Sequence, residues 1–307
     1  MTDKNKKLLL IAIPVAVVVI AALIVGAIFL FGNANDTYRT IKVYRVEGGA
    51  EVQKAAGDVL TPYENMLLQN NDSVKTLEDG YLYLKLDEDK YLLAEPGASF
   101  SLIATGDAQN SKTRIEIAYG AVTVHVTKAL SGDSSFEIGT GNSTMAVRGT
   151  SFRVSATTDE QGNTTSTLEV FEGQVSVQPT QPDGSAGQPT DVSAGQAAVV
   201  NENGEVEKTA EGVVLEALDD STLEFLKVAI ENGKDIGVSA EELDQILANR
   251  QKTFTVTFVF EGRVFATERV AYGELATRPT LMPAPRGNWE FDFATPITED
   301  VTINWVE

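Results

Sequence analysis

The chain has 307 residues, of which 43% are apolar, enough for two or three domains with ordinary hydrophobic cores. It contains no cysteine, which excludes a disulfide framework, a thiolate metal site and a lipid-modified cysteine. The formal net charge of −20 argues against a nucleic-acid partner, because phosphate binding requires clustered Lys and Arg. Such acidity is more typical of a solvated surface than of a surface that binds cations or a basic partner.

The N-terminal segment predicts a membrane anchor. Residues 8–31 carry no charge, and as a helix they would reach about 36 Å, enough for a hydrocarbon core of about 30 Å. Lysines precede this span, so the positive-inside rule predicts a cytoplasmic tail at residues 1–7 and an extracellular location for everything after Phe31. A cleaved signal peptide is the alternative, but the run exceeds the roughly 7–15 apolar residues of such peptides. We therefore expect an uncleaved, single-pass anchor in the cell membrane.

Residues 38–206 predict an all-β domain, because short alternating segments are divided there by Gly, Asn and Asp. The apolar residues change from odd to even positions at Gly120 and Gly149, and from even to odd at Gly173. Side chains alternate faces along a strand, so each change requires a turn, a bulge or a corner, where glycine is favoured. These units predict strands that pass from one sheet to another, in a β-sandwich or in a β-roll with solenoid character.

One of these corners lies in the sequence STMAVRGTSFRV at residues 143–154. We interpret Val147, Arg148, Gly149, Thr150 and Phe152 as a structural motif. Arg148 has the planar fork that binds a carboxylate or phosphate ligand, but a structural ion pair is the favoured interpretation. The expected partners of Arg148 are acids on neighbouring strands: Glu116, Glu137 or Glu169.

The motif resembles the FecR domain. AVRGTSFRV is preceded by SSFEIGTGNSTM and followed by LEVFEGQVSV and DVSAGQAAVV, which are similar to the V-R-G-T-x-F-x-V core, the later E-G-x-V-x-V hairpin and the closing A-G-Q element of that family. The resemblance covers residues 40–205, with Asn70-Asn71-Asp72 where Gly-Asp is usual. It implies a link to transmembrane signal regulators, which relay an outer-membrane signal to an inner anti-sigma domain.

Residues 212–251 predict a helical hairpin. The first helix has Ser221 as its expected N-cap and ends at Asn232-Gly233, and the second begins with a capping box of Ser239 and Glu242. The apolar faces of the two helices require a partner, most simply the adjoining β-domain.

Residues 253–307 predict a second β module. Its strand at 256–260, Tyr272-Gly273, Trp289 and Trp305 are similar to the internalin-type B-repeat (Listeria–Bacteroides repeat). The resemblance implies a small β-grasp-like surface module, present here in one copy.

No catalytic, cofactor or metal site is expected. His125 is the only histidine and no G-x-S-x-G sequence is present, so we expect a surface or interface histidine and not a catalytic one. Zinc would require several His or Cys ligands, and Asp87-Glu88-Asp89 lacks a calcium-loop pattern and is interpreted as a hairpin tip. Paired carboxylates for glycoside hydrolysis remain open at this stage.

These patterns favour a membrane-anchored, extracellular, non-catalytic binding or assembly module at the bacterial cell surface. The expected ligand is a cell-wall polymer, a matrix component or another surface protein, with no binding residue identified. The alternative is a sensory or regulatory component of transmembrane signalling that acts through a partner protein, because residues 1–7 are too short for an anti-sigma domain. A surface glycan hydrolase is the third and least favoured interpretation.

Overall fold

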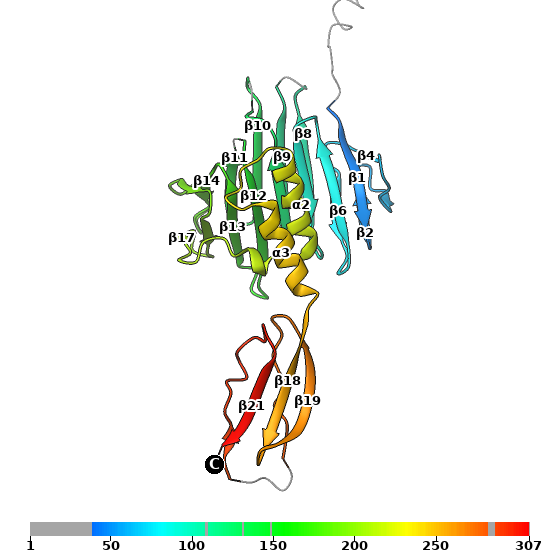
Figure 1. Ribbon diagram of the computed structural model, residues 1–307. Helices are drawn as coiled ribbons and strands as arrows, with labels where there is room; N and C mark the ends of the chain where they lie inside the picture. Colours follow the sequence, from blue (N-terminus) through cyan, green and yellow to red (C-terminus); the bar gives the residue numbers. More distant parts are fainter. Residues whose placement is uncertain (1–38, 108–109, 131, 148, 282–285, 307) are drawn as a thin grey trace, which may run out of the picture.

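The computed structural model describes residues 39–306, except 108–109, 131, 148 and 282–285 (Figure 1). The predicted tail, the predicted anchor at residues 8–31 and Arg148 therefore lie outside the described residues. No helix in the described part of the chain is long and apolar enough to span a bilayer. The prediction of a mainly β chain is confirmed, since the described residues contain two α-helices and more than twenty strands.

Seventeen strands form two β-sheets, here called ladder A and ladder B, that share β9 (Lys112–Val126). Ladder A runs in the order β4 (Leu67–Leu68), β1 (Ile41–Glu47), β6 (Tyr81–Leu86), β7 (Lys90–Ala94), the second half of β9, β12 (Ser151–Thr158), β13 (Thr164–Glu172), β16 (Ala197–Val200) and β17 (Val206–Lys208). Ladder B runs in the order β3 (Val59–Leu60), β2 (Ala50–Gln53), β5 (Ser73–Thr76), β8 (Ser99–Thr105), the first half of β9, β10 (Ser135–Thr140), β11 (Ser143–Val147), β14 (Gln174–Pro179) and β15 (Thr190–Ser193). All neighbours are antiparallel except β9 and β10.

The main hydrophobic core consists of side chains from both ladders, such as Leu84 and Val124 of ladder A and Ile115 and Val175 of ladder B. Burying these apolar side chains is the main stabilising contribution to the domain.

The three glycine positions at which the alternation changes coincide with a change of ladder. The chain passes from ladder B to ladder A within β9 at Gly120 and between β11 and β12 at Gly149, and it returns to ladder B between β13 and β14 at Gly173. Gly120 has a φ of +84°, and a Cβ atom there would lie 2.4 Å from the Ala98 Cα, so both conformation and space require glycine. The prediction that strands pass from one sheet to another is confirmed.

The helical hairpin covers the outer face of ladder A (Figure 1). Its helices are α2 (Asp220–Glu231) and α3 (Ala240–Arg250), preceded by the 3₁₀ turn η1 (Leu215–Ala217). Phe225 of α2 packs with Tyr83 and Leu93, and Leu226 packs with Phe171 of β13. The predicted packing against the β-domain is thereby confirmed.

The caps of the two helices differ in how well they were predicted. The capping box of Ser239 and Glu242 is confirmed. The prediction of Ser221 as the N-cap of α2 was wrong, because the cap is Asp219, whose carboxylate accepts hydrogen bonds from the backbone N–H and the hydroxyl of Thr222. A carboxylate also interacts favourably with the helix dipole, which favours Asp219 over the serine.

The C-terminal module follows α3 and lies at the end of the molecule opposite the start of β1 (Figure 1). It contains a four-stranded sheet in the order β19 (Arg263–Ala271), β18 (Thr253–Phe260), β21 (Val301–Val306) and β20 (Asn288–Trp289), with β18 and β21 parallel. Trp289 is buried against Phe258, and its indole N–H donates to the Pro279 carbonyl at 3.0 Å.

Candidate functional site

The corner at residues 147–152 is a closed part of the fold. Val147, Thr150 and Phe152 are buried, and Gly149 has a φ of +65°. A Cβ atom on Gly149 would lie 3.2 Å from the Ala129 Cα, a contact that leaves little room for a side chain. The described residues of the motif thus lie at the crossover between the ladders, with Val147, Thr150 and Phe152 buried there.

The acids expected to pair with Arg148 are bound by two other arginines. Arg114 Nε lies 2.7 Å from Glu116 and its Nη1 3.3 Å from Glu137, on the outer face of ladder B. Glu169 is bound by Arg153, whose Nη1 lies 2.8 Å from the Glu169 carboxylate. The sequence reasoning missed Arg153, although it lies in the same motif.

Arg153 is the centre of a partly buried polar network on the outer face of ladder A. Its Nε and Nη2 donate to the two carboxylate oxygens of Glu95 at 2.7 Å each, and the Thr123 hydroxyl donates to Glu95 at 3.0 Å. The Glu95 side chain is only 6% exposed. Burial lowers the pKa of the Arg153 guanidinium, but hydrogen bonds and charges from Glu95 and Glu169 outweigh it and raise that pKa. The network therefore joins strands β9, β12 and β13 to Glu95, the residue after β7, as a fixed ion-pair cluster and not as an open anion site.

A second polar cluster lies beneath the hairpin and includes the only histidine. His125 Nδ1 is 2.8 Å from the Ser151 Oγ, and that hydroxyl donates to Glu172 at 3.3 Å. Lys234, which follows α2, lies 3.4 Å from the same glutamate. The His125 ring is 3% exposed and stacks with Tyr91, so it occupies an interface between elements of the chain.

This Ser, His and Glu arrangement does not have the geometry of a hydrolase. In a catalytic triad the acid contacts the imidazole, whereas here Glu172 contacts the serine hydroxyl. Ser151 is fully buried, and His125 Nε2 is buried with no partner among the described residues. Burial, with a smaller contribution from Lys234, lowers the pKa of His125 to about 4, so the imidazole is neutral at pH 7. The cluster holds the hairpin side of ladder A together and gives no access to a substrate.

The acidic tip between β6 and β7 is also engaged in ion pairs. Asp87 accepts from Arg39 Nη2 at 2.7 Å, and Asp89 accepts from Lys90 Nζ at 2.6 Å. Arg39 also donates to the carbonyls of Thr105 and Lys112, so it connects the β6–β7 hairpin of ladder A to the β8–β9 hairpin of ladder B. Within the described residues, no group of three or more His, Asp or Glu side chains could hold a metal ion.

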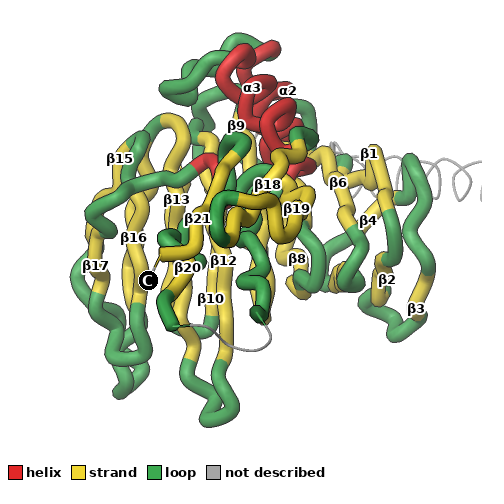
Figure 2. The backbone as a smooth tube through the Cα atoms, turned by 60° about the horizontal axis from the view of Figure 1, so that its bottom comes forward, coloured by secondary structure: helices red, strands yellow, loops and turns green. Residues whose placement is uncertain are grey.

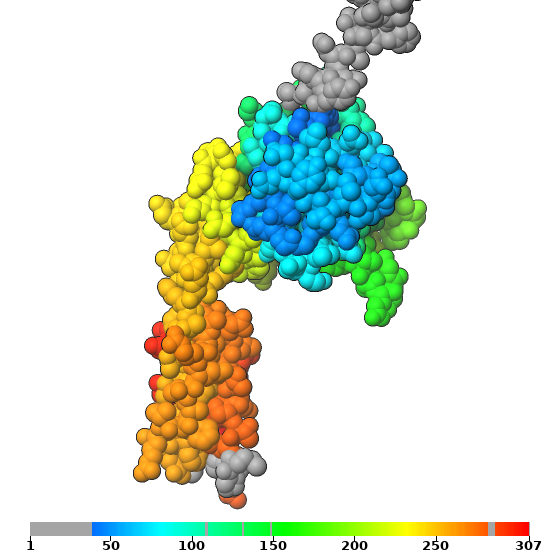
Figure 3. Space-filling view, turned by 90° about the vertical axis from the view of Figure 1, so that its right-hand side faces the viewer, coloured from blue at the N-terminus to red at the C-terminus, as the bar shows by residue number. Residues whose placement is uncertain are grey.

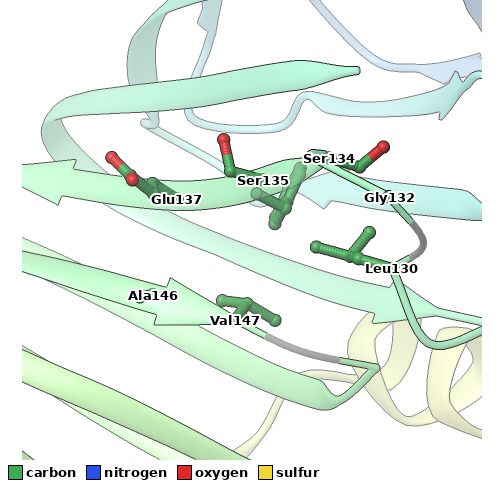
Figure 4. A pocket seen from close by; sticks show the side chains of 8 residues that line it. Leu130, Gly132, Ser134, Ser135, Glu137, Ala146 and Val147 are labelled. Carbon is green, nitrogen blue, oxygen red and sulfur yellow. The ribbon is translucent and has the colours of Figure 1, made fainter. Parts of the chain in front are cut away.

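A pocket of about 260 Å³ lies beside the corner, between the loop before β10 and the end of β11 (Figure 4). Leu130 and Val147 lie toward one another across it, while the Ser135 hydroxyl and the Glu137 carboxylate point away from them (Figure 4). Glu137 is already bound by Arg114. The described lining residues include no Lys, Arg or His side chain.

The most open apolar feature of the β-domain is its end wall, which we define as residues 59–68. This segment includes β3 and β4, the edge strands of the two ladders, and lies at the opposite end of the domain from β15, β16 and β17 (Figure 2). Its exposed fractions are 58% for Val59, 43% for Leu60, 65% for Tyr63 and 60% for Leu67. These four large apolar side chains are exposed within nine residues at one end of the domain, which makes the end wall a candidate interaction surface. The alternation in this short segment was too irregular to predict it from the sequence.

The comparisons with known proteins concern mainly the centre of the β-domain. Residues 72–176, from the residue before β5 to the third residue of β14, match the family model described as FecR protein. No curated protein matches the chain. The end wall, the hairpin and the C-terminal module lie outside the matched residues.

Among the solved structures similar to the chain are two that are described as a candidate anti-sigma factor from Parabacteroides distasonis ATCC 8503. One, at 2.50 Å resolution, is 18% identical, and the match covers 46% of this chain and 60% of that one, with a TM-score of 0.37. The other, at 1.65 Å resolution, is 12% identical and covers 76% of this chain and 98% of its own, with a TM-score of 0.39. At these TM-scores the likeness carries no argument about function.

Proposed function

We propose that this chain is a non-enzymatic regulatory component of a transmembrane signalling system, which acts by contact with a partner protein. The observation that carries the proposal is the match of residues 72–176 to the FecR protein family. The FecR family, which the sequence motifs also resemble, is one of regulators of transmembrane signalling. The match supports this alternative better than a binding or assembly module for a wall polymer or matrix component.

The geometry of the polar groups supports a role without catalysis. Arg153 is neutralised by two glutamates, and Ser151 and His125 are buried. In these two clusters, the side chains capable of acid–base or nucleophilic chemistry are thus held in ion pairs or hidden from solvent. The domain therefore acts through contact surfaces, and its most exposed apolar surface is the end wall.

Membrane attachment and orientation form the finer part of the proposal. Residues 8–31 are the anchor, the β-domain lies outside the cytoplasm, and the C-terminal module acts as a B-repeat-like surface module. In this arrangement the signal reaches the cytoplasm through a partner that itself crosses the membrane.

The proposal is tested in cells that carry or lack the full chain. We expect loss of the chain to change a defined set of transcripts under inducing conditions, and the wild-type chain to restore them. Photo-crosslinking from exposed positions on α2, such as Val228, should capture a membrane protein other than the chain itself in the same cells. Unchanged transcripts together with saturable binding of a wall polymer would contradict regulation and support an assembly role.

Topology is tested separately by protease treatment of intact cells. Digestion of the β-domain and the C-terminal module from outside is the expected result. Complete protection of both, with digestion after lysis, would contradict the proposed orientation while leaving a regulatory role to be decided by the transcripts.

A further inference from the structure

We infer that the end wall is the surface through which two copies of this chain associate side by side in the membrane. The inference rests on the proposed membrane anchor and goes beyond it by naming a partner, a second copy of the chain. It is carried by the exposed side chains of the wall, the position of the wall relative to the N-terminus and the charges beside it.

The wall combines features of a protected sheet edge with exposed apolar side chains. Edge strands are usually shielded by short length, charged side chains, proline or a covering element, and the wall has Pro62, the exposed Glu64 and strands of only two residues. Here Val59, Leu60, Tyr63 and Leu67 are all more than 40% exposed, and no helix of the described chain covers them. Figure 3 views the molecule from this side, where the blue N-terminal residues form a broad face that neither the hairpin nor the C-terminal module covers.

The orientation of the wall follows from where the chain enters the domain. Only residues 32–40 separate the apolar run from Ile41 at the start of β1, a reach of about 30 Å when fully extended. The start of β1 and the C-terminal module lie at opposite ends of the molecule, so the β1 end faces the bilayer (Figure 1). The wall then faces sideways, along the membrane plane, where a second anchored copy is presented at the same height and in the same orientation.

Two copies in one bilayer are related most simply by a two-fold axis along the membrane normal, and such a contact uses the same patch on both copies. This axis is roughly parallel to the strands, so the rotation exchanges the front and back layers of the domain. The edge of ladder A in one copy, β4, is then opposite the partner's β3 at the edge of ladder B. Leu67 consequently packs against the partner's Val59, and the Tyr63 side chains of both copies lie near the axis.

The charges beside the wall fit this arrangement. Lys42 is directly opposite Leu67 in the β1–β4 register and therefore lies beside the ladder A edge. Asp58 is exposed and immediately precedes Val59 at the ladder B edge. The rotation that brings β4 to the partner's β3 brings Lys42 toward the partner's Asp58. These two pairs of opposite charges flank the contact and oppose the repulsion between the two exposed Glu64 side chains, which are next to Tyr63 in the sequence.

The chain lacks cysteine, so introduced cysteines report contacts without background. The full chain is reconstituted in vesicles and oxidised mildly. We expect disulfide-linked dimers for Tyr63→Cys alone and for a mixture of Val59→Cys with Leu67→Cys, because a disulfide requires Cβ atoms about 3.5–4.5 Å apart. Adding Leu67→Asp to Tyr63→Cys should abolish the dimer. The matched control is Val228→Cys on α2, which is 50% exposed and should give no dimer above chance encounters.

The outcomes separate this inference from the proposed function. Monomer for every wall variant, in vesicles that retain the chain after alkaline extraction, would overturn the dimer and leave the anchor and the regulatory role intact. A polarity-sensitive label at Tyr63→Cys that reports a lipid environment would overturn it as well, since the bilayer would then be the occupant. Crosslinking of a chain that alkaline extraction removes from the vesicles would support the dimer and contradict the anchor.

Discussion

Arg153 and Arg114 provide a test of how burial sets the strength of an ion pair. Each guanidinium binds two glutamates, but the side chains of Arg153, Glu95 and Glu169 are 21%, 6% and 13% exposed. Those of Arg114, Glu116 and Glu137 are 32%, 38% and 38% exposed. Because water already solvates the second cluster, the two arginines should contribute very different free energies of unfolding.

The substitution Arg153→Met removes three charge-assisted hydrogen bonds of 2.7–2.8 Å and leaves Glu95 with the Thr123 hydroxyl alone. A buried carboxylate without its partner costs about 3–5 kcal/mol of unfolding free energy. Arg114→Met should cost only about 0–1 kcal/mol. Combining Arg153→Met with Glu95→Gln should recover part of the loss, since the uncompensated charge is then removed.

Hydrogen exchange measured by mass spectrometry on peptides from β12 and β13 is the suitable assay, because it reports the β-domain directly. Tryptophan fluorescence would report the wrong part of the chain, since Trp289 and Trp305 both lie in the C-terminal module. Equal and small losses of protection for the two methionine variants would refute the argument that burial decides the cost.

Three further predictions concern the histidine, the corner and the hairpin. The pKa of His125 is about 4 in the folded chain and near 6.5 in the unfolded chain, so the unfolded state takes up a proton first as the pH falls. The free energy of unfolding should therefore decrease by up to about 3 kcal/mol as the pH drops from about 6.5 to about 4. His125→Phe should flatten this part of a urea-midpoint profile, and an unchanged slope would show that other groups cause it. Gly149→Val should lower the free energy of unfolding by about 1–3 kcal/mol through backbone strain, plus a packing penalty. Gly162→Val is the control, because Gly162 also has a positive φ but no atom lies within 4 Å of its added Cβ, so only the strain should appear. Equal melting temperatures for the two variants would argue against a packed corner. Phe225→Ala should cost about 3 kcal/mol and raise hydrogen exchange throughout α2, while Val228→Ala, on the exposed side, should leave exchange nearly unchanged.

The glycine corners and the helix caps are features that can be inferred from local sequence. Gly120, Gly149 and Gly173 were identified as corners because the alternation of side chains is a property of neighbouring residues, and a change of phase is visible without knowing the partners of a strand. The capping box of α3 is local in the same way. The N-cap of α2 was misplaced because Asp219, Asp220 and Ser221 are all good caps, and the choice depends on where packing starts the helix.

Contacts between distant segments could not be inferred in this way. Glu95 and Arg153 are 58 residues apart, so the partner of the arginine depends on the order of strands in ladder A. His125 has the alternation of an outward-facing residue, yet a hairpin about one hundred residues later in the chain covers it. The sequence AVRGTSFRV contains both Arg148 and Arg153, and the register that places Arg153 opposite Glu169 could not be inferred from it.

The sequence by itself determined the mainly β character of the chain, the corners at which strands change sheets and the two amphipathic helices, because propensity, alternation and capping act over a few residues. The tertiary structure alone decided which charges are paired, that His125 is buried and that four apolar side chains remain exposed on the end wall. These properties depend on the solvent exposure and the neighbours of each group, and both are created only when strands far apart in the sequence form the two ladders.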